Sequence, residues 1–194
     1  EISPGEVAAF LVEPVQGEGG YYPAGTGFFA ELRRLADEHG ILLIADEVQT
    51  GFGRTGEWFA VDHYGVTPDI MAMGKAIANG LPLSAVGARA DLADAWSPGS
   101  HGTTFGGNPV CCAAAIATMY SLAKVLPGVS GRSTHSFERF ATMQSDLGVV
   151  GDVRGLGLMI GIELVRDRET NEPFARSATV AERILQAARE SGVL

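Results

Sequence analysis

Three apolar runs of the sequence are each followed by side chains that can do acid–base or carbonyl chemistry. Those side chains are Glu13, the pair Asp46 and Glu47, and Lys75. Continuous apolar runs of four to six residues are typical of strands that are buried on both faces of a parallel sheet. Ligands of such sheets bind beyond the carboxyl ends of the strands. We therefore expect two or three carboxylates and one lysine to meet at one edge of a sheet.

Lys75 is unusual because the fourteen basic residues comprise only two lysines, Lys75 and Lys124, and twelve arginines. Its segment, Met-Ala-Met-Gly-Lys-Ala-Ile-Ala, is apolar, and such neighbours partly desolvate an ammonium group and ease its deprotonation. A free amine is the form that condenses with a carbonyl group. The alternative is an ordinary surface lysine on a loop. The residues alone leave these two interpretations about even.

Asp46 ends a strongly apolar run, so we expect its carboxylate to be buried or half buried. A carboxylate in that position needs a cationic or hydrogen-bonding partner. A pyridinium nitrogen would satisfy it, and so would an arginine or a helix N-terminus. On position alone, structural pairing is the favoured interpretation.

The segment 51–56, Gly-Phe-Gly-Arg-Thr-Gly, matches the dinucleotide-binding pattern GxGxxG and follows a predicted strand. Its surroundings argue against nucleotide binding. Asp46 and Glu47 would repel a pyrophosphate there, and Gly65 with Pro68 leaves room only for a short helix.

The segment 101–108, His-Gly-Thr-Thr-Phe-Gly-Gly-Asn, is a polar, glycine-rich loop before a predicted helix. Such a loop can present hydroxyl and backbone N–H groups to a phosphate, or it can be a simple tight connection. The other histidines, His39, His63 and His135, are isolated in the sequence. We expect no metal site.

The composition limits the classes of function. A formal net charge of −9 without any run of Lys or Arg disfavours nucleic acid and anionic membranes as partners. The longest apolar runs are far shorter than the roughly 18 residues of a membrane span, and no leader opens the chain. The adjacent Cys111 and Cys112 suit a reducing compartment rather than a structural disulfide. We expect a cytoplasmic globular protein.

Hydrophobic periodicity predicts the elements that position these residues. Strands are predicted over residues 7–12, 41–45, 69–73, 83–88 and 157–165, and helices from Phe28 to Gly40 and over 90–96, 108–125 and 180–190. Residues 126–147 are rich in Pro, Gly, Ser and Thr, so only a weak helix that starts near Ser133 is expected there. We place a domain boundary near residue 125, with 1–125 in a large domain and 126–194 in a small one.

Four segments in a fixed order resemble the class III aminotransferases. They are Glu-Pro-Val-Gln-Gly-Glu-Gly-Gly at 13–20, Ala-Asp-Glu-Val-Gln-Thr-Gly-Phe-Gly-Arg-Thr-Gly at 45–56, Gly-Lys-Ala-Ile-Ala-Asn-Gly-Leu-Pro-Leu at 74–83, and the loop 101–108. The resemblance implies the type I fold of pyridoxal-phosphate-dependent transferases, a mostly parallel α/β sheet flanked by helices with a smaller α+β domain. It also implies pyridoxal 5′-phosphate as cofactor and a homodimer with shared active sites.

The resemblance also implies a role for each matching residue. Lys75 resembles the catalytic lysine that carries the cofactor as a Schiff base, and Asp46 the carboxylate paired with the pyridine nitrogen. Val48 would pack on a ring face, and Gln49 would bind the phenolic oxygen. Thr104, with Thr103, would reach the phosphate of the cofactor in the neighbouring subunit. Glu18 and Glu13 would line the substrate site.

The segments 77–85 and 94–99 resemble most closely the branch that acts on 4-aminobutyrate and other omega-amino acids, with 2-oxoglutarate as amino acceptor. Acetylornithine or ornithine aminotransferase is the close alternative. A non-catalytic module that keeps the fold is a less favoured one. The family's segments that precede and follow the present motifs are not found in this sequence, so we expect the chain alone to be inactive.

Overall fold

The computed structural model describes residues 2–193. Its central sheet has four strands in the order β1-β4-β5-β6. The strands β1, β4 and β5 run parallel, and β6 pairs with β5 in the antiparallel direction. The strand bounds are β1 Ala9–Val12, β4 Leu42–Asp46, β5 Ile70–Met73 and β6 Ala85–Ala88. The predicted mostly parallel α/β sheet is therefore observed, with one antiparallel edge strand.

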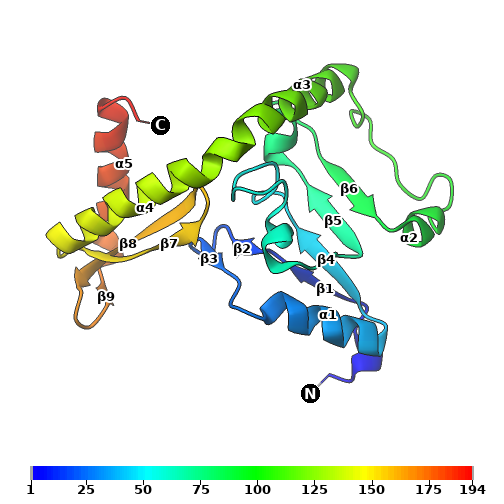
Figure 1. The fold of residues 1–194 in the computed structure, drawn as a ribbon, viewed down its shortest axis with the longest axis horizontal. Helices are drawn as coiled ribbons and strands as arrows, with labels where there is room; N and C mark the ends of the chain where they lie inside the picture. The colour runs from blue at the N-terminus through cyan, green and yellow to red at the C-terminus, as the bar shows by residue number, and fades with distance from the viewer. Residues whose placement is uncertain (1, 194) are drawn as a thin grey trace.

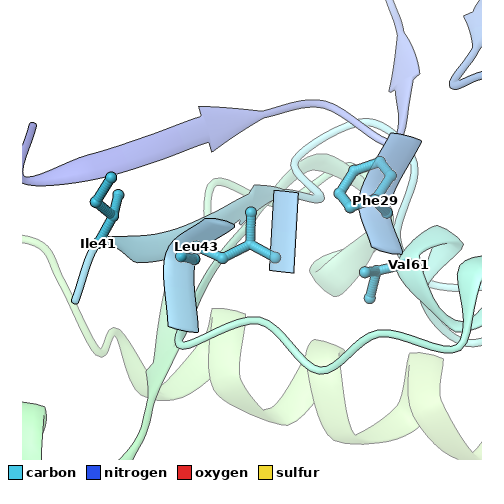
Figure 2. Close-up of a cluster of buried hydrophobic side chains, with 5 residues drawn as sticks. Phe29, Ile41, Leu43 and Val61 are labelled. Carbon is cyan, nitrogen blue, oxygen red and sulfur yellow. The ribbon is translucent and has the colours of Figure 1, made fainter. Parts of the chain in front are cut away.

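The first crossover connects β1 to β4 through helix α1, Phe28–His39. The helix ends at Gly40, which adopts the left-handed conformation and donates its N–H to the carbonyl of Ala36. One side of α1 packs on the sheet, where Phe29 of the helix lies near Leu43 of β4 and Val61 (Figures 1 and 2). This buried cluster fixes the strand that carries Asp46.

Short helices, a small hairpin and turns surround the strands of the central sheet. They include the 3₁₀ helices η1 Pro4–Glu6, η2 Ala60–Tyr64 and η3 Lys75–Ala78, the hairpin of β2 Val15–Gln16 with β3 Tyr22–Pro23, and helix α2 Ala90–Asp94. The η3 helix directly follows β5, so it begins at the edge where β5 ends. Its residues Ile77 and Ala78 are buried against Phe52 and against Ala115 of the long helix α3.

Helix α3, Pro109–Val125, starts as predicted, because the Asn108 side chain accepts hydrogen bonds from the N–H groups of Val110 and Cys111. It continues through η4, Leu126–Gly128, into α4, Val129–Asp146, so that the two helices run end to end (Figure 1). Beneath α4 lies a second sheet of the strands β7 Val150–Leu156, β8 Met159–Asp167 and β9 Glu172–Pro173. The chain then forms η5 Arg176–Ala178 and α5 Val180–Glu190.

One sequence prediction for the second half of the chain was wrong, and one strand was missed. The helix expected to be weak and to begin near Ser133 is an 18-residue helix that begins at Val129. Val129 is buried, and the helix packs on β7, so tertiary packing outweighs the poor intrinsic propensity of its Gly and Ser residues. The strand β7 was not predicted at all.

The continuous helical stretch Pro109–Asp146 is long and apolar enough to cross a membrane by length and composition, with a mean hydropathy of 1.6 in its apolar window. The sequence predicted the helix over 108–125 but not its membrane-spanning length, because Thr118, Ser121 and Lys124 divide its apolar residues into short runs. Core helices of globular proteins pass the same test. Here α3 packs on η3 through Ala115, but only 11% of the apolar window is buried within residues 2–193, and the absence of a membrane partner remains a prediction.

Candidate functional site

Asp46 and Lys75 lie at the same edge of the central sheet. Asp46 is the last residue of β4 and pairs in register with Ala72 of β5. The N–H of Glu47 then donates a 2.9 Å hydrogen bond to the carbonyl of Ala72, three residues before Lys75. The rule that strand ends gather polar side chains thus correctly brought these two residues to one edge.

Lys75 and Gln49 line one cavity of about 190 Å³. Four of its other lining residues, Tyr21, Arg54, Leu158 and Met159, were not among the predicted site residues, and Ala76 completes it. Leu158 and Met159 come from the β7–β8 hairpin, and Tyr21 from the loop before β3. No local pattern in the sequence signals that these distant segments meet at Lys75.

A larger cavity of about 610 Å³ lies beside the first, between the turn 52–54 and helices α3 and α4. It shares Arg54, Ala76 and Leu158 with the smaller cavity but does not contain Lys75 or Gln49. The smaller cavity is the better candidate site, because it holds the amine and the amide that can act on a substrate.

Lys75 is exposed, so the expectation that its apolar neighbours shield it from water was wrong, but its backbone is held in a strained conformation. Its φ is 44°, a left-handed value that a non-glycine residue adopts at a cost on the order of 1 kcal/mol. The following residues Ile77 and Ala78 are buried, and they anchor η3 on α3. Strain that the surroundings hold in place is common at functional residues, and here it sets the direction in which the amine leaves the sheet edge.

Asp46, Val48 and Gly74 form the floor beside Lys75. One oxygen of the half-buried Asp46 carboxylate accepts a 3.0 Å hydrogen bond from the N–H of Val48. The side chain of Val48 covers Gly74, where a Cβ atom would lie 3.3 Å from Val48 Cγ1. Within residues 2–193 the structure gives Asp46 no cationic partner, so its other oxygen is available to a ligand.

Gln49 reaches across the sheet edge to the loop that contains Glu13. The Glu13 carboxylate accepts a 2.7 Å hydrogen bond from the N–H of Gly17. Gln49 lies so close to Gly17 that a Cβ atom there would be 2.0 Å from Gln49 Oε1. Only glycine at position 17 therefore allows Gln49 to occupy this place. Glu13, Gly17 and Gln49 form one local cluster next to the cavity.

Glu47 does not belong to the site, although it follows the same strand as Asp46. It is fully buried and accepts hydrogen bonds from the Thr50 hydroxyl, the Ala60 N–H at 3.0 Å and the Val61 N–H at 2.7 Å. Burial raises the pKa of this carboxyl, and the three donors oppose that rise. Its function is to fix the turn 47–50, which presents Val48 and Gln49.

Of the predicted site residues, only Lys75 and Gln49 line this cavity. Asp46 and Val48 lie at the sheet edge next to it, Glu13 lines a separate cavity, and three further residues lie at exposed positions. Glu18 is exposed at the tip of the loop between β2 and β3. Thr103 and Thr104 are exposed in the loop that precedes α3, where Phe105 is also exposed. Their roles in phosphate and substrate binding remain predictions that a second subunit or a ligand would have to complete.

The GxGxxG segment 51–56 forms a series of turns and is followed by the short η2 helix. It offers no long helix N-terminus for a pyrophosphate, which agrees with its dismissal as a nucleotide motif. His63 contacts the backbone oxygen and the hydroxyl of Thr55, each at 3.2 Å. Across residues 2–193 no group of three or more metal-ligating side chains is found.

The residues that are present fit pyridoxal phosphate. A pyridine ring that carries an aldehyde needs an amine, a carboxylate for its nitrogen, and an apolar contact for its face. Lys75, the free oxygen of Asp46 and the side chain of Val48 supply these at one edge, and Gln49 adds a hydrogen-bond donor. The donor set therefore matches this cofactor better than a metal or a dinucleotide.

A family model described as aminotransferase class-III matches residues 1–194. The chain belongs to the class III aminotransferases. This confirms the predicted family and pyridoxal phosphate as its cofactor. The 4-aminobutyrate aminotransferase of Escherichia coli is 41% identical over 100% of this chain. Acetylornithine aminotransferase of Methanopyrus kandleri is 48% identical over 84% of this chain, and leucine/methionine racemase of Thermococcus litoralis is 41% identical over 100%.

Solved structures of transaminases have the same fold. A transaminase from a marine Virgibacillus is 31% identical, with a TM-score of 0.90 over 99% of this chain and 45% of its own. An amine transaminase from an uncultivated Pseudomonas species, in its pyridoxal-phosphate-bound form, is 39% identical, with a TM-score of 0.86 over 96% of this chain and 44% of its own. The three curated relatives are covered over 41 to 45% of their own length. The chain thus spans less than half of each relative.

Proposed function

We propose that the complete protein is an aminotransferase that moves an amino group from 4-aminobutyrate or a similar omega-amino acid to 2-oxoglutarate. The family membership supports amino transfer, and the placement of Lys75 and Gln49 in one cavity beside Asp46 is the observation that carries the proposal. The E. coli relative named for 4-aminobutyrate supports this choice of donor.

The roles of the residues follow from their positions. When bound, pyridoxal phosphate supplies a ring that withdraws electrons from the substrate carbon. The Asp46 carboxylate would hold a proton on the ring nitrogen, since it has an unused oxygen at the sheet edge. Lys75 would hold the cofactor before the reaction and then move a proton between substrate and cofactor carbons. Val48 and Gln49 would orient the ring from the turn that Glu47 fixes.

The oligomeric state and the residues that bind the substrate are further parts of the proposal. Glu18 and Glu13 would line the donor site, and Thr103 with Thr104 would bind the cofactor phosphate of a neighbouring subunit. An exposed polar loop before α3 is suited to such an exchange between two subunits. We accordingly propose a homodimer, with a 2-oxo acid as acceptor, that acts in the cytoplasm.

A panel of amino donors tests the substrate choice on the complete protein. With 2-oxoglutarate as acceptor, we expect 4-aminobutyrate or 5-aminovalerate to give the highest kcat/KM. A higher kcat/KM for acetylornithine or ornithine would identify that compound as the donor instead. The 48% identical relative, an acetylornithine aminotransferase, supports this alternative.

The same panel includes a test for racemisation, which the Thermococcus relative's name raises. Conversion of L-leucine or L-methionine to its D-enantiomer, with no amino group passed to 2-oxoglutarate from any donor, would contradict amino transfer. Absence of both reactions would favour the non-catalytic module.

A further inference from the structure

Arg154 of β7 connects the second sheet to the loop before β3. Its Nε donates a 2.8 Å hydrogen bond to the carbonyl of Gly20, and its guanidinium carbon lies 3.7 Å from the centre of the Tyr22 ring. The side chain is 16% exposed, so these contacts are largely shielded from water. A planar guanidinium can make a hydrogen bond and a ring contact together, which a lysine ammonium cannot do equally well.

Two carboxylates fix the orientation of this guanidinium. Asp152 accepts a 2.8 Å bond from Nη1, and Glu163 of the neighbouring strand β8 accepts a second one from the same nitrogen. The Tyr22 hydroxyl also donates to Glu163, at 3.3 Å. Carboxylates of the β7–β8 hairpin thus orient the Arg154 guanidinium, and its Nε is left to bind the Gly20 carbonyl.

The Gly20 carbonyl belongs to the peptide group that determines the φ angle of Tyr21. That angle is 61°, a left-handed value which a tyrosine adopts only when contacts enforce it. The Tyr21 N–H donates a 2.9 Å bond to the carbonyl of Gln16, so the same peptide group is held at both ends. Tyr21 in this conformation lines the cavity that contains Lys75.

The hairpin that carries Arg154 also contacts the site at a second point. The Leu158 N–H donates a 3.0 Å bond to the carbonyl of Arg54, and Gly157 lies so close to Thr55 that a Cβ atom there would be 2.3 Å from its carbonyl carbon. Leu158 and Met159 beyond this contact line the Lys75 cavity. The β7–β8 hairpin therefore contacts the walls of the cavity at two points: Arg154 binds the loop that contains Tyr21, and Gly157 packs on the turn that contains Arg54.

We propose that Arg154 is a positioning residue for the amino-donor site: through the Gly20 carbonyl it holds the loop 17–21, and so keeps Tyr21 in the cavity that contains Lys75. Arg154 lines neither cavity and so acts through the loop rather than on the substrate. This proposal deepens the proposed aminotransferase function and depends on it only for the kinetic measurement.

Hydrogen–deuterium exchange on the complete protein measures the loop directly. We compare wild type with Arg154→Ala and Arg154→Lys, and we use Arg168→Ala as control, because Arg168 also donates to a backbone carbonyl, that of Gln144, at an exposed place. Arg154→Ala should speed exchange in residues 17–22, Arg154→Lys should do so less, and Arg168→Ala should leave that peptide unchanged. Unchanged exchange in Arg154→Ala would overturn the proposal.

Steady-state kinetics then separate positioning from a general loss of structure. Loss of a hydrogen bond from a charged donor should raise the KM of the amino donor roughly ten-fold. The effects on kcat and on the affinity for pyridoxal phosphate should be smaller, and Arg154→Lys should restore part of the KM. An equal fall in cofactor affinity and in thermal stability, with the donor KM unchanged, would contradict the proposal.

The two proposals can fail separately. If the wild-type protein transfers no amino group from any donor but Arg154→Ala still frees the loop, the proposed function fails and the positioning of the loop stands. If the wild type is active and the loop and the KM do not respond to Arg154→Ala, the function stands and the role of Arg154 is refuted.

Discussion

Lys75 and Gln49 face one cavity from the ends of two adjacent parallel strands, β5 and β4. Each residue comes shortly after the last hydrogen-bonded pair of its strand, so the sheet itself sets their separation. Neither depends on a long flexible loop for its place. An amine and an amide on so rigid a support are suited to hold a small planar ligand in one orientation.

Asp46→Asn should lower kcat roughly a hundred-fold while it leaves the fold intact. The asparagine oxygen can still accept the Val48 N–H, so the turn keeps its shape, but the negative charge toward the ligand is lost. The measurement is kcat together with the thermal unfolding temperature. The control is Asp62→Asn, because Asp62 also accepts a backbone N–H, from Phe59, on the surface. An equal kcat for Asp46→Asn and Asp62→Asn would show that Asp46 has no role in the site.

Gly17→Ala should displace Gln49 and reduce activity without a large loss of stability. The added methyl would lie 2.0 Å from Gln49 Oε1, and that side chain can move aside. Gly25→Ala is the matched control, since a Cβ atom there meets nothing within 4 Å. We expect a lower affinity for pyridoxal phosphate in Gly17→Ala, measured by titration of the cofactor-free protein. Identical affinity in both variants would refute the predicted role of Gln49.

Asp69 stabilises the opposite end of the sheet. Burial opposes its ionisation, but the Leu43 N–H and the guanidinium groups of Arg33 and Arg89 outweigh burial and hold its pKa below the ordinary value. Because the folded-state pKa is the lower one, this stabilisation is present above the ordinary pKa and is lost as the pH falls through the lowered one.

Asp69→Asn should therefore lower the free energy of unfolding at neutral pH by about 2 kcal/mol, with a difference from wild type that shrinks in acid. Urea unfolding between pH 7 and pH 3 measures this difference. Asp91→Asn is the control, because Asp91 pairs with the same Arg89 at the exposed surface, where ion pairs contribute little. A difference for Asp69→Asn that does not change with pH would contradict the assignment.

The sequence was sufficient to predict the central sheet and the edge at which its reactive side chains lie. Apolar runs separate strands from helices, and the strand-end rule places Asp46 and Lys75 together without any knowledge of the family. The same rule could not separate Asp46 from Glu47. Glu47 differs from Asp46 because its carboxylate binds the N–H groups of Ala60 and Val61. These residues begin η2, which packs against the strand, and no local pattern in the sequence predicts that contact.

The second half of the chain was harder to predict because its structure depends on distant contacts. Helix α4 contains Gly131 and several Ser and Thr residues, yet packing on β7 stabilises it. Arg154 likewise could not be recognised as a site-forming residue, since its partner Gly20 lies 134 positions away. Local patterns carry no signal for contacts at such separations.

The most direct test of the account is to locate the lysine that binds the cofactor. The complete protein, loaded with pyridoxal phosphate, is reduced with borohydride, and its peptides are analysed by mass spectrometry. We predict that the pyridoxyl group is found on Lys75 and that Lys75→Ala carries none. Attachment at Lys124, or at no residue of this chain while the protein transfers amino groups, would contradict the account.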